Sequence, residues 1–299
     1  MSRAFLFYNV TKVKLYNMKK DIIIIGCGLF GSVTAKYLRD KGMNVLTIDN
    51  ESPLAASKCS FGLWRDGWIE KIKSKASVGI SVLKKYAKVE KKELFDPFKE
   101  KIVDFHYIDC DQLLEEPDMK ATVHNVHNNT VYLTDNTKIK ADIIIIAAGY
   151  YTNEILFKSD LETRKLDGLW GATMDVDLDI DSDRLWEWAP YKQAMILKKE
   201  GYFMFGDGST VKNPAKMTDA RIKSTSERLQ QHLNTLCGAN IDNQNIIRVR
   251  EGMRPKLSNP DEDYIKKHTD SIYSVTGGGK NSTVLSGYVA QELYKLISE

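Results

Sequence analysis

A glycine-rich turn between a buried strand and a helix is the feature that most limits what this 299-residue chain can fold into. Residues 21–25 read DIIII, an apolar run that predicts a strand covered on both faces. The next six residues, GCGLFG, have the G-x-G-x-x-G spacing, and apolar residues at helical spacing follow them. A second strand over 44–49 ends in Asp49. This order predicts an α/β, Rossmann-type domain that binds a dinucleotide.

The three glycines have different roles in such a turn. Gly26 permits the tight turn, Gly28 lets the backbone approach a pyrophosphate, and Gly31 lets the helix lie close to the strand. The N–H groups and dipole at the start of the helix favour phosphate, and Asp49 would accept hydrogen bonds from ribose hydroxyls. A glycine turn without a ligand is the alternative. The residues predicted to contact the dinucleotide here are Gly26, Gly28, Leu29, Phe30, Gly31, Asp49 and Asn50.

A second strand–glycine–helix element, TGGGKNSTVLSG, occupies residues 276–287. It lacks the G-x-G-x-x-G spacing, so we do not interpret it as a second dinucleotide site. A flavin gains negative charge near N1 and C2=O on reduction, and a helix N-terminus with Lys280 beside it would stabilise that charge. An ordinary glycine turn is the alternative. The predicted contacts are Gly277, Gly278, Gly279, Lys280, Asn281 and Ser282.

The remaining pattern predicts a discontinuous arrangement with two domains. Strands are expected within 122–149, 169–206, 246–253 and 271–279, and helices over 224–237, where Ser224 and Glu227 form a capping box, and over 282–298. We expect an FAD-binding domain of residues 18–64, 117–165 and 262–299, interleaved with a smaller α+β substrate domain of residues 65–116 and 166–261. Residues 1–17 fit neither domain; we expect an N-terminal extension, an added strand or a start-site artefact.

Ten lysines fall within residues 71–101, a stretch whose apolar spacing predicts one or two amphipathic helices. A solvated helix face is one interpretation, and a docking surface for a phosphate-bearing partner is the other. The net charge of +3 does not by itself indicate nucleic acid.

The four cysteines and five histidines lack metal-ligand spacing, so no metal site is predicted. Reduced thiols are typical of an intracellular protein, and we expect a cytoplasmic location. No apolar run approaches the roughly 18 residues of a membrane helix, so no membrane partner is expected. The pattern does not indicate an oligomeric state.

Five stretches together resemble the D-amino-acid oxidase family of FAD oxidoreductases, which includes glycine oxidase and sarcosine oxidase. They are IIIIGCGLFG, AASKCSFGLW, ADIIIIAAGYY, REGMRPKLSNPDED and SVTGGGKNSTVLSG. The resemblance implies that Ala56, Ser57, Lys58 and Gly62 wrap the FAD, with Ala148 and Gly149 also at the cofactor. It implies that Arg254, in the G-[LM]-R-P motif, pairs with a substrate carboxylate, which suits the fork of a guanidinium. With no cysteine near the C-terminal loop, a non-covalent FAD is expected.

This resemblance implies an oxidoreductase that oxidises the C–N bond of a small, glycine-like amine or amino acid by hydride transfer to flavin N5. Arg254, Lys280 and Tyr202 are the candidate catalytic residues, and Tyr191 is a further candidate to line the pocket. The stretch between Gly62 and Thr122 is shorter than in relatives, which together with the lysines leaves a second hypothesis: the same chemistry on a glycine-type amine attached to a nucleobase of RNA or modified DNA. A third is a non-catalytic FAD-binding subunit, against which Arg254 and Lys280 argue.

Overall fold

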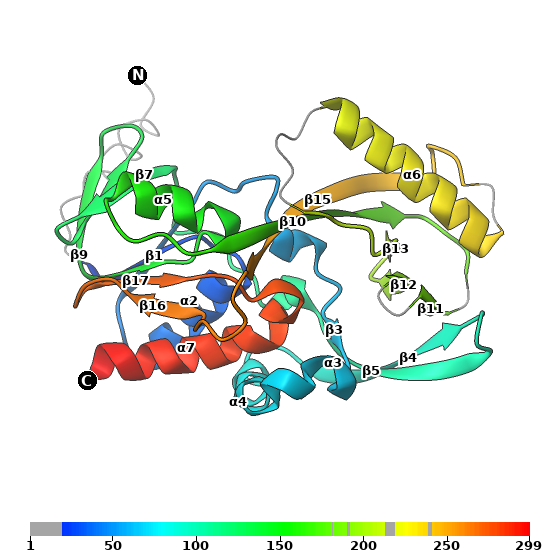
Figure 1. Cartoon of the computed structure of the whole chain (residues 1–299), viewed down its shortest axis with the longest axis horizontal. Coiled ribbons are helices and arrows are strands. Elements are labelled where there is room, and N and C mark those ends of the chain that lie inside the picture. Colours follow the sequence, from blue (N-terminus) through cyan, green and yellow to red (C-terminus); the bar gives the residue numbers. More distant parts are fainter. Residues whose placement is uncertain (1–19, 181, 190–191, 213–218, 239–240) are drawn as a thin grey trace, which may run out of the picture.

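The computed structural model describes residues 20–180, 182–189, 192–212, 219–238 and 241–299 (Figure 1). The predicted extension, residues 1–17, and the candidate Tyr191 lie outside these ranges. In the described part of the chain, no helix has the length and apolar character needed to cross a membrane. The same ranges hold no cluster of three or more His, Cys, Asp or Glu residues that could bind a metal.

The first sheet has the order β16-β17-β9-β1-β2-β6. Its central strands run parallel, with β1 between β9 and β2, and the edge strand β16 is antiparallel to β17. The strands are β1 (Lys20–Ile25), β2 (Val45–Asp49), β6 (Met119–Lys120), β9 (Lys138–Ile146), β16 (Ile265–Lys267) and β17 (Ile272–Val275).

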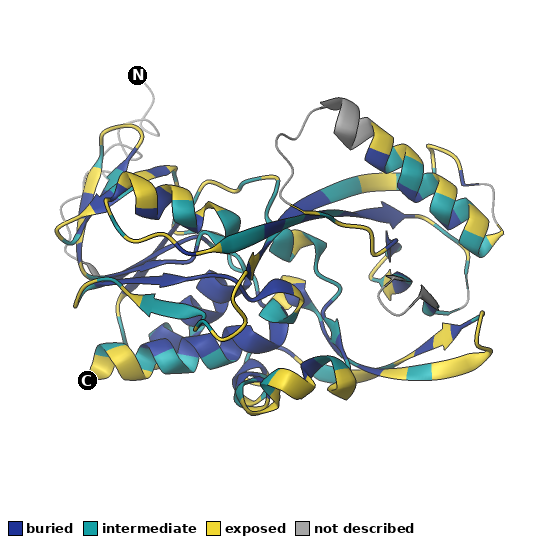
Figure 2. Ribbon diagram, in the orientation of Figure 1, coloured by how far each residue is buried: buried dark blue, intermediate teal, exposed yellow. Residues whose placement is uncertain are grey.

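The apolar run of β1 is explained by cover on both faces of this sheet. Ile22 and Ile24 pack toward helices α2 (Leu29–Asp40), α4 (Lys73–Leu83) and α7 (Ser282–Ser298). Ile23 and Ile25 pack on the opposite side, against β7 (Val123–His127), β8 (Thr130–Leu133) and α5 (Thr152–Lys158). Because side chains alternate along a strand, one β1 sequence supplies both cores. Figure 1 shows α2 and α7 on one side of the sheet and α5 on the other, and Figure 2 shows these strands buried.

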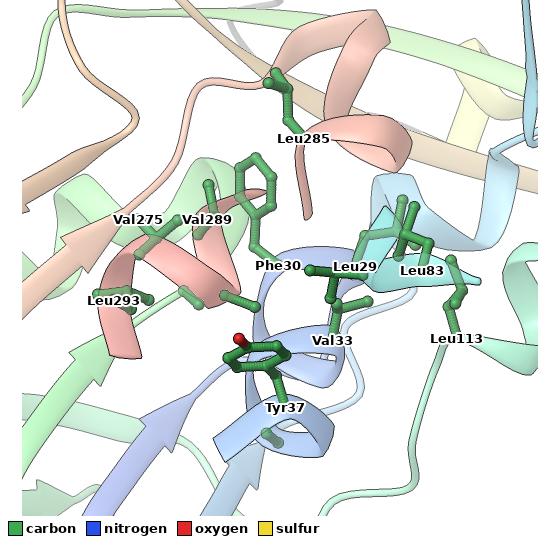
Figure 3. Packing of buried hydrophobic residues seen from close by; sticks show 14 of the residues in the cluster. Leu29, Phe30, Val33, Tyr37, Leu83, Leu113, Val275, Leu285, Val289 and Leu293 are labelled. Carbon is green, nitrogen blue, oxygen red and sulfur yellow. The ribbon is translucent and has the colours of Figure 1, made fainter. Parts of the chain in front are cut away.

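Helices α2 and α7 bring the two predicted glycine loops together. Their contact is built from Leu29, Phe30, Val33 and Tyr37 of α2 and Leu285, Val289 and Leu293 of α7, with Leu83, Leu113 and Val275 at its borders (Figure 3). Since each loop directly precedes one of these helices, this packing fixes the two helix N-termini relative to each other.

The second sheet has the order β14-β10-β13-β12-β11-β4-β5-β3, with β15 also paired to β10. Helix α6 (Asp219–Cys237) covers one face through Leu229 and Leu233 (Figure 1). The strands are β3 (Leu63–Trp64), β4 (Val89–Asp96), β5 (Lys101–Ile108), β10 (Leu166–Val176), β11 (Arg184–Ala189), β12 (Lys192–Lys199), β13 (Tyr202–Gly206), β14 (Val211–Lys212) and β15 (Ile246–Leu257). The domain boundaries given above stay a prediction.

Three expectations about secondary structure were wrong. The lysine-rich stretch is helical only up to Leu83, in a short 3-10 helix (Glu70–Ile72) and in α4. Its second half forms β4, where the buried Leu94 and Asp96 have the period of two that suits pairing with β5. Helix α6 starts at Asp219, so Ser224 lies inside the helix and is not its cap. Strand β15 does not end before Arg254, because its pairing with β10 continues to Leu257.

Candidate functional site

A cavity of about 900 Å³ is lined by residues of both sheets. This volume lies at the upper end of the roughly 300–1,000 Å³ that small-molecule sites occupy. The first sheet contributes the turn after β1, the end of β2 with Asp49, and residues 147–149 after β9. The second sheet contributes residues of β10, β12 and β15, among them Arg254. The carboxyl ends of the parallel strands therefore border the cavity, which is the usual ligand position in doubly wound α/β folds.

Two positions in the turn after β1 accommodate only glycine. Gly26 has φ +104°, and a Cβ there would lie 2.5 Å from the carbonyl oxygen of Ala147. A Cβ on Gly31 would lie 1.8 Å from the carbonyl oxygen of Gly26. Gly26 thus permits the turn and Gly31 the close approach of helix and strand, as the spacing predicts. Gly31 does this from a buried position and does not line the cavity.

Side chains from two other segments are hydrogen bonded to this turn. The N–H of Leu29, the first residue of α2, donates to Ser57 Oγ at 2.9 Å. The N–H of Cys27 donates to Asp49 Oδ2 at 2.6 Å. An oxygen acceptor at the N-terminus of α2 occupies the kind of position where a phosphate oxygen is stabilised. Gly28, Ser57 and Asp49 all line the cavity, so the predicted phosphate and ribose contacts surround one space.

The C-terminal glycine loop reaches the cavity through only part of its length. Gly279, Lys280 and Ser282 line it, together with Thr283. Gly277 and Gly278 pack instead: a Cβ would lie 2.3 Å from Leu257 Cγ at the first and 2.6 Å from Phe30 Cζ at the second. Asn281 directly precedes α7 and does not line the cavity.

Arg254 projects from β15 into the cavity wall, where its strand pairs with Leu169 of β10. Among the described residues, no carboxylate lies within ion-pairing distance of its guanidinium. Burial lowers the pKa of Arg254, and the nearby Cys59 opposes this shift. Burial also lowers the pKa of Lys280, and Arg254, Arg65 and Lys256 add to this effect. This end of the cavity is therefore a place for an anion.

Some of the predicted site residues are not brought to the cavity. Tyr202 lies at the start of β13, where its hydroxyl is 3.3 Å from Nη2 of Arg250, itself paired with the buried Asp175. The pleat of β13 thus turns this tyrosine toward a separate ionic cluster. Lys58 contributes its carbonyl oxygen to the same Arg250, at 2.6 Å. The predicted residues that do line the cavity are Gly26, Gly28, Leu29, Phe30, Asp49, Asn50, Ala56, Ser57, Gly62, Ala148, Gly149, Arg254, Gly279, Lys280 and Ser282.

Several lining residues were not predicted from the sequence. Arg65 and Trp68 follow β3, and Gln193 and Met195 lie on β12. Cys59 also lines the cavity, and burial raises the pKa of its thiol to about 11. The AASKCSFGLW stretch ends at Trp64, one residue before Arg65, so the family pattern did not include Arg65 or Trp68. The sequence of β12 carried no signal for Gln193 or Met195.

No protein-family model and no curated protein sequence matches the chain. Solved structures do. The chain is similar to iminodiacetate oxidase from Chelativorans sp. BNC1, with a TM-score of 0.66, 14% identity, and coverage of 93% of this chain and 95% of that one. It is also similar to glycine oxidase from Geobacillus kaustophilus (TM-score 0.66, 10% identity, 94% and 95% covered). A third is glycerol-3-phosphate dehydrogenase from Bacillus halodurans in complex with FAD (TM-score 0.70, 14% identity, 97% and 66% covered). The predicted fold is thereby confirmed.

Proposed function

We propose that this chain, which has the fold of the D-amino-acid oxidase family of FAD oxidoreductases, binds FAD non-covalently and oxidises the C–N bond of a small amine or amino acid. The observation that carries the proposal is Arg254, a half-buried guanidinium without a carboxylate partner among the described residues, in the same cavity as the G-x-G-x-x-G turn. The solved structures similar to this chain include an iminodiacetate oxidase, a glycine oxidase and an L-amino acid deaminase, which supports an amine substrate.

The residues present suit FAD along the whole cavity. Asp49 and Asn50 would face the adenosine ribose, and the N-terminus of α2 with Ser57 would bind the pyrophosphate. Gly279, Lys280 and Ser282, at the N-terminus of α7, would face the pyrimidine edge of the ring. At Gly28 a Cβ would lie 3.0 Å from Ser57 Oγ, so a side chain there would fill the space that the phosphates need.

The chemistry assigned to the protein is binding and orientation. FAD, when bound, supplies the acceptor for the hydride that leaves the carbon next to nitrogen. Arg254 would bind the substrate carboxylate and so orient the C–H bond. Phe61, Leu63 and Met195 line the same cavity and would exclude water from the amine. Tyr202 has no part in this account, because it does not line the cavity.

The nucleic-acid hypothesis receives less support from the structure. None of the ten lysines in residues 71–101 lines the cavity. Four of them lie close to acids: Lys75 with Asp263, Lys88 with Glu90, Lys92 with Asp183 and Lys99 with Glu187. We therefore favour a solvated surface for this stretch and a free small amine as substrate. The cytoplasmic location remains the expectation, since all four cysteines are free thiols.

The test is anaerobic reduction of the purified protein by a panel of amines. The panel contains free amino acids, N-methyl amino acids and glycine-modified nucleosides, and bleaching of the flavin absorbance is recorded for each. Rapid bleaching by one class of small amine supports the proposal and names the class. Bleaching by the nucleosides alone transfers the function to the second hypothesis. A yellow protein that no amine reduces contradicts catalysis of this kind.

A further inference from the structure

Positive charge exceeds negative charge at the Arg254 end of the cavity. Arg254, Lys280 and Arg65 all line it, and Lys256 is near enough to lower the pKa of Lys280 together with the two arginines. The described acids that line the cavity are Asp49 and Glu154. Asp49 accepts from the N–H of Cys27 at the turn after β1, and Glu154 pairs with Lys158 on α5. Neither acid compensates the cations at the Arg254 end.

Arg65 and Lys280 both lie close to the ring of Trp68. The guanidinium carbon of Arg65 lies 5.0 Å from the centre of the Trp68 ring, and Nζ of Lys280 lies 5.6 Å from it. Both cations are therefore within reach of one aromatic side chain that itself lines the cavity. Arg65 and Arg254 are far apart in the sequence and reach the same end of the cavity.

A carboxylate holds Arg65 in place and leaves part of its guanidinium free. Nη2 of Arg65 donates to Oε1 of Glu187 at 2.8 Å, and Lys99 contacts Oε2 of the same carboxylate at 2.7 Å. Gln193, which lines the cavity, also donates to Glu187. The Glu187 side chain is only 10% exposed and serves two cations. A guanidinium has five N–H donors, and Glu187 engages Arg65 through Nη2, so others remain for a ligand.

We propose that the substrate carries a second acidic group, remote from the carboxylate that Arg254 binds, and that Arg65 binds it. This inference rests on the proposed function and deepens it by naming the substrate class as an amine with two acidic groups. With Arg254 assigned to one carboxylate and Lys280 to the cofactor edge, Arg65 is the cation left to recognise another anion. A planar guanidinium, oriented by Glu187 and by the faces of Trp68 and Phe105, is preorganised for a carboxylate.

The kinetic test compares substrates that differ by one carboxylate. Iminodiacetate is set against N-methylglycine, and D-aspartate against D-alanine, in the flavin-containing enzyme. We expect the diacid of at least one pair to have the lower KM, and Arg65→Gln to raise that KM by about tenfold or more while the monoacid changes little. Arg65→Lys should recover part of the loss, because it keeps the charge without the fork. Lys99→Gln is the matched control, since Lys99 contacts the same Glu187 but does not line the cavity.

A binding test gives a readout that does not depend on turnover. Calorimetric titration of the flavin-containing protein with malonate and with acetate should show tighter binding of malonate, and Arg65→Gln should abolish the difference. An unchanged diacid KM in Arg65→Gln, or equal binding of malonate and acetate by the wild type, overturns the inference. If no amine reduces the flavin but the malonate preference depends on Arg65, the proposed function fails while the second acidic subsite stands.

Discussion

The hydroxyl of Ser57 accepts a 2.9 Å hydrogen bond from the backbone N–H of Leu29, 28 residues earlier in the chain. This bond ties the segment after β2 to the N-terminus of α2, at the place where the chain has its G-x-G-x-x-G turn. The position of Gly28 follows from it, since a Cβ on Gly28 would lie 3.0 Å from the same oxygen. Helix N-terminus, serine and glycine together surround one space for phosphate.

Replacing Gly28 by valine should therefore weaken FAD binding more than it destabilises the fold. We expect Gly28→Val to be purified with little or no flavin, because the side chain fills the phosphate space, and to lose about 1–3 kcal/mol of folding stability through overpacking. The measurements are the flavin-to-protein ratio and the denaturant midpoint. Gly67→Ala is the control, since a Cβ on Gly67 meets nothing within 4 Å. A Gly28→Val protein with a full complement of flavin would contradict the assignment.

Acid denaturation should release the flavin intact. Cys59 is the cysteine that lines the cavity in the described chain, and burial raises its thiol pKa to about 11, so at neutral pH it is a protonated, poor nucleophile. We expect precipitation with acid to leave all FAD in the supernatant, and mass spectrometry to find the polypeptide without an added flavin. Yellow precipitate with the flavin mass still attached would show a covalent link instead.

Anion binding should weaken at a lower pH than it would beside a lysine with the usual pKa. Burial, and then Arg254, Arg65 and Lys256, hold the pKa of Lys280 below its usual value. Lys280 is assigned to the cofactor edge, but its charge also attracts an anion held by the nearby Arg254. This attraction is present at neutral pH, where Lys280 is charged, and is lost as pH rises through that lowered pKa. The dissociation constant of a competitive carboxylate, measured against pH, should rise as pH passes the pKa of Lys280. In Lys280→Gln the rise should disappear; an identical pH profile would assign it to another group.

Reversing the charges of Lys84, Lys85 and Lys88 should leave oxidation of a small amine unchanged. All three are exposed, and none lines the cavity. We expect kcat/KM of the variant to match wild type at low and high salt, as for a control in which Lys138 and Lys140 are reversed. With a nucleic-acid-attached amine, a higher KM and a flatter salt dependence confined to the first variant would instead support the docking-surface interpretation.

The elements that the sequence predicts well are those whose reason is local. The G-x-G-x-x-G turn needs glycine because the backbone of Gly26 has a positive φ and because Gly31 meets the carbonyl of Gly26. Helix α7 and the glycine loop before it were likewise predicted from their local sequence pattern. Arg254 could be found because its motif resembles a family pattern, although the strand that contains it runs four residues beyond the expected end at Met253, to Leu257.

What could not be predicted depends on contacts between distant segments. Arg65 reaches the cavity because β3 pairs with β5 and because Glu187, 122 residues later, holds its guanidinium. Tyr202 was misplaced because a strand with alternating faces does not reveal which face looks toward a ligand. In the stretch after Leu83, lysines stand between the apolar residues, so the apolar spacing fitted a helix as well as the strand β4.

The role of Arg254 is tested by the steady-state kinetics of Arg254→Ala with an amine that has a carboxylate and with one that has none. We expect the variant to keep FAD with a nearly native spectrum, because Arg254 is assigned to the substrate. We expect a loss in kcat/KM equivalent to about 2–5 kcal/mol for the carboxylate substrate, partly recovered in Arg254→Lys, and a much smaller loss for the other amine. A wild-type kcat/KM of Arg254→Ala on the carboxylate substrate would contradict the account.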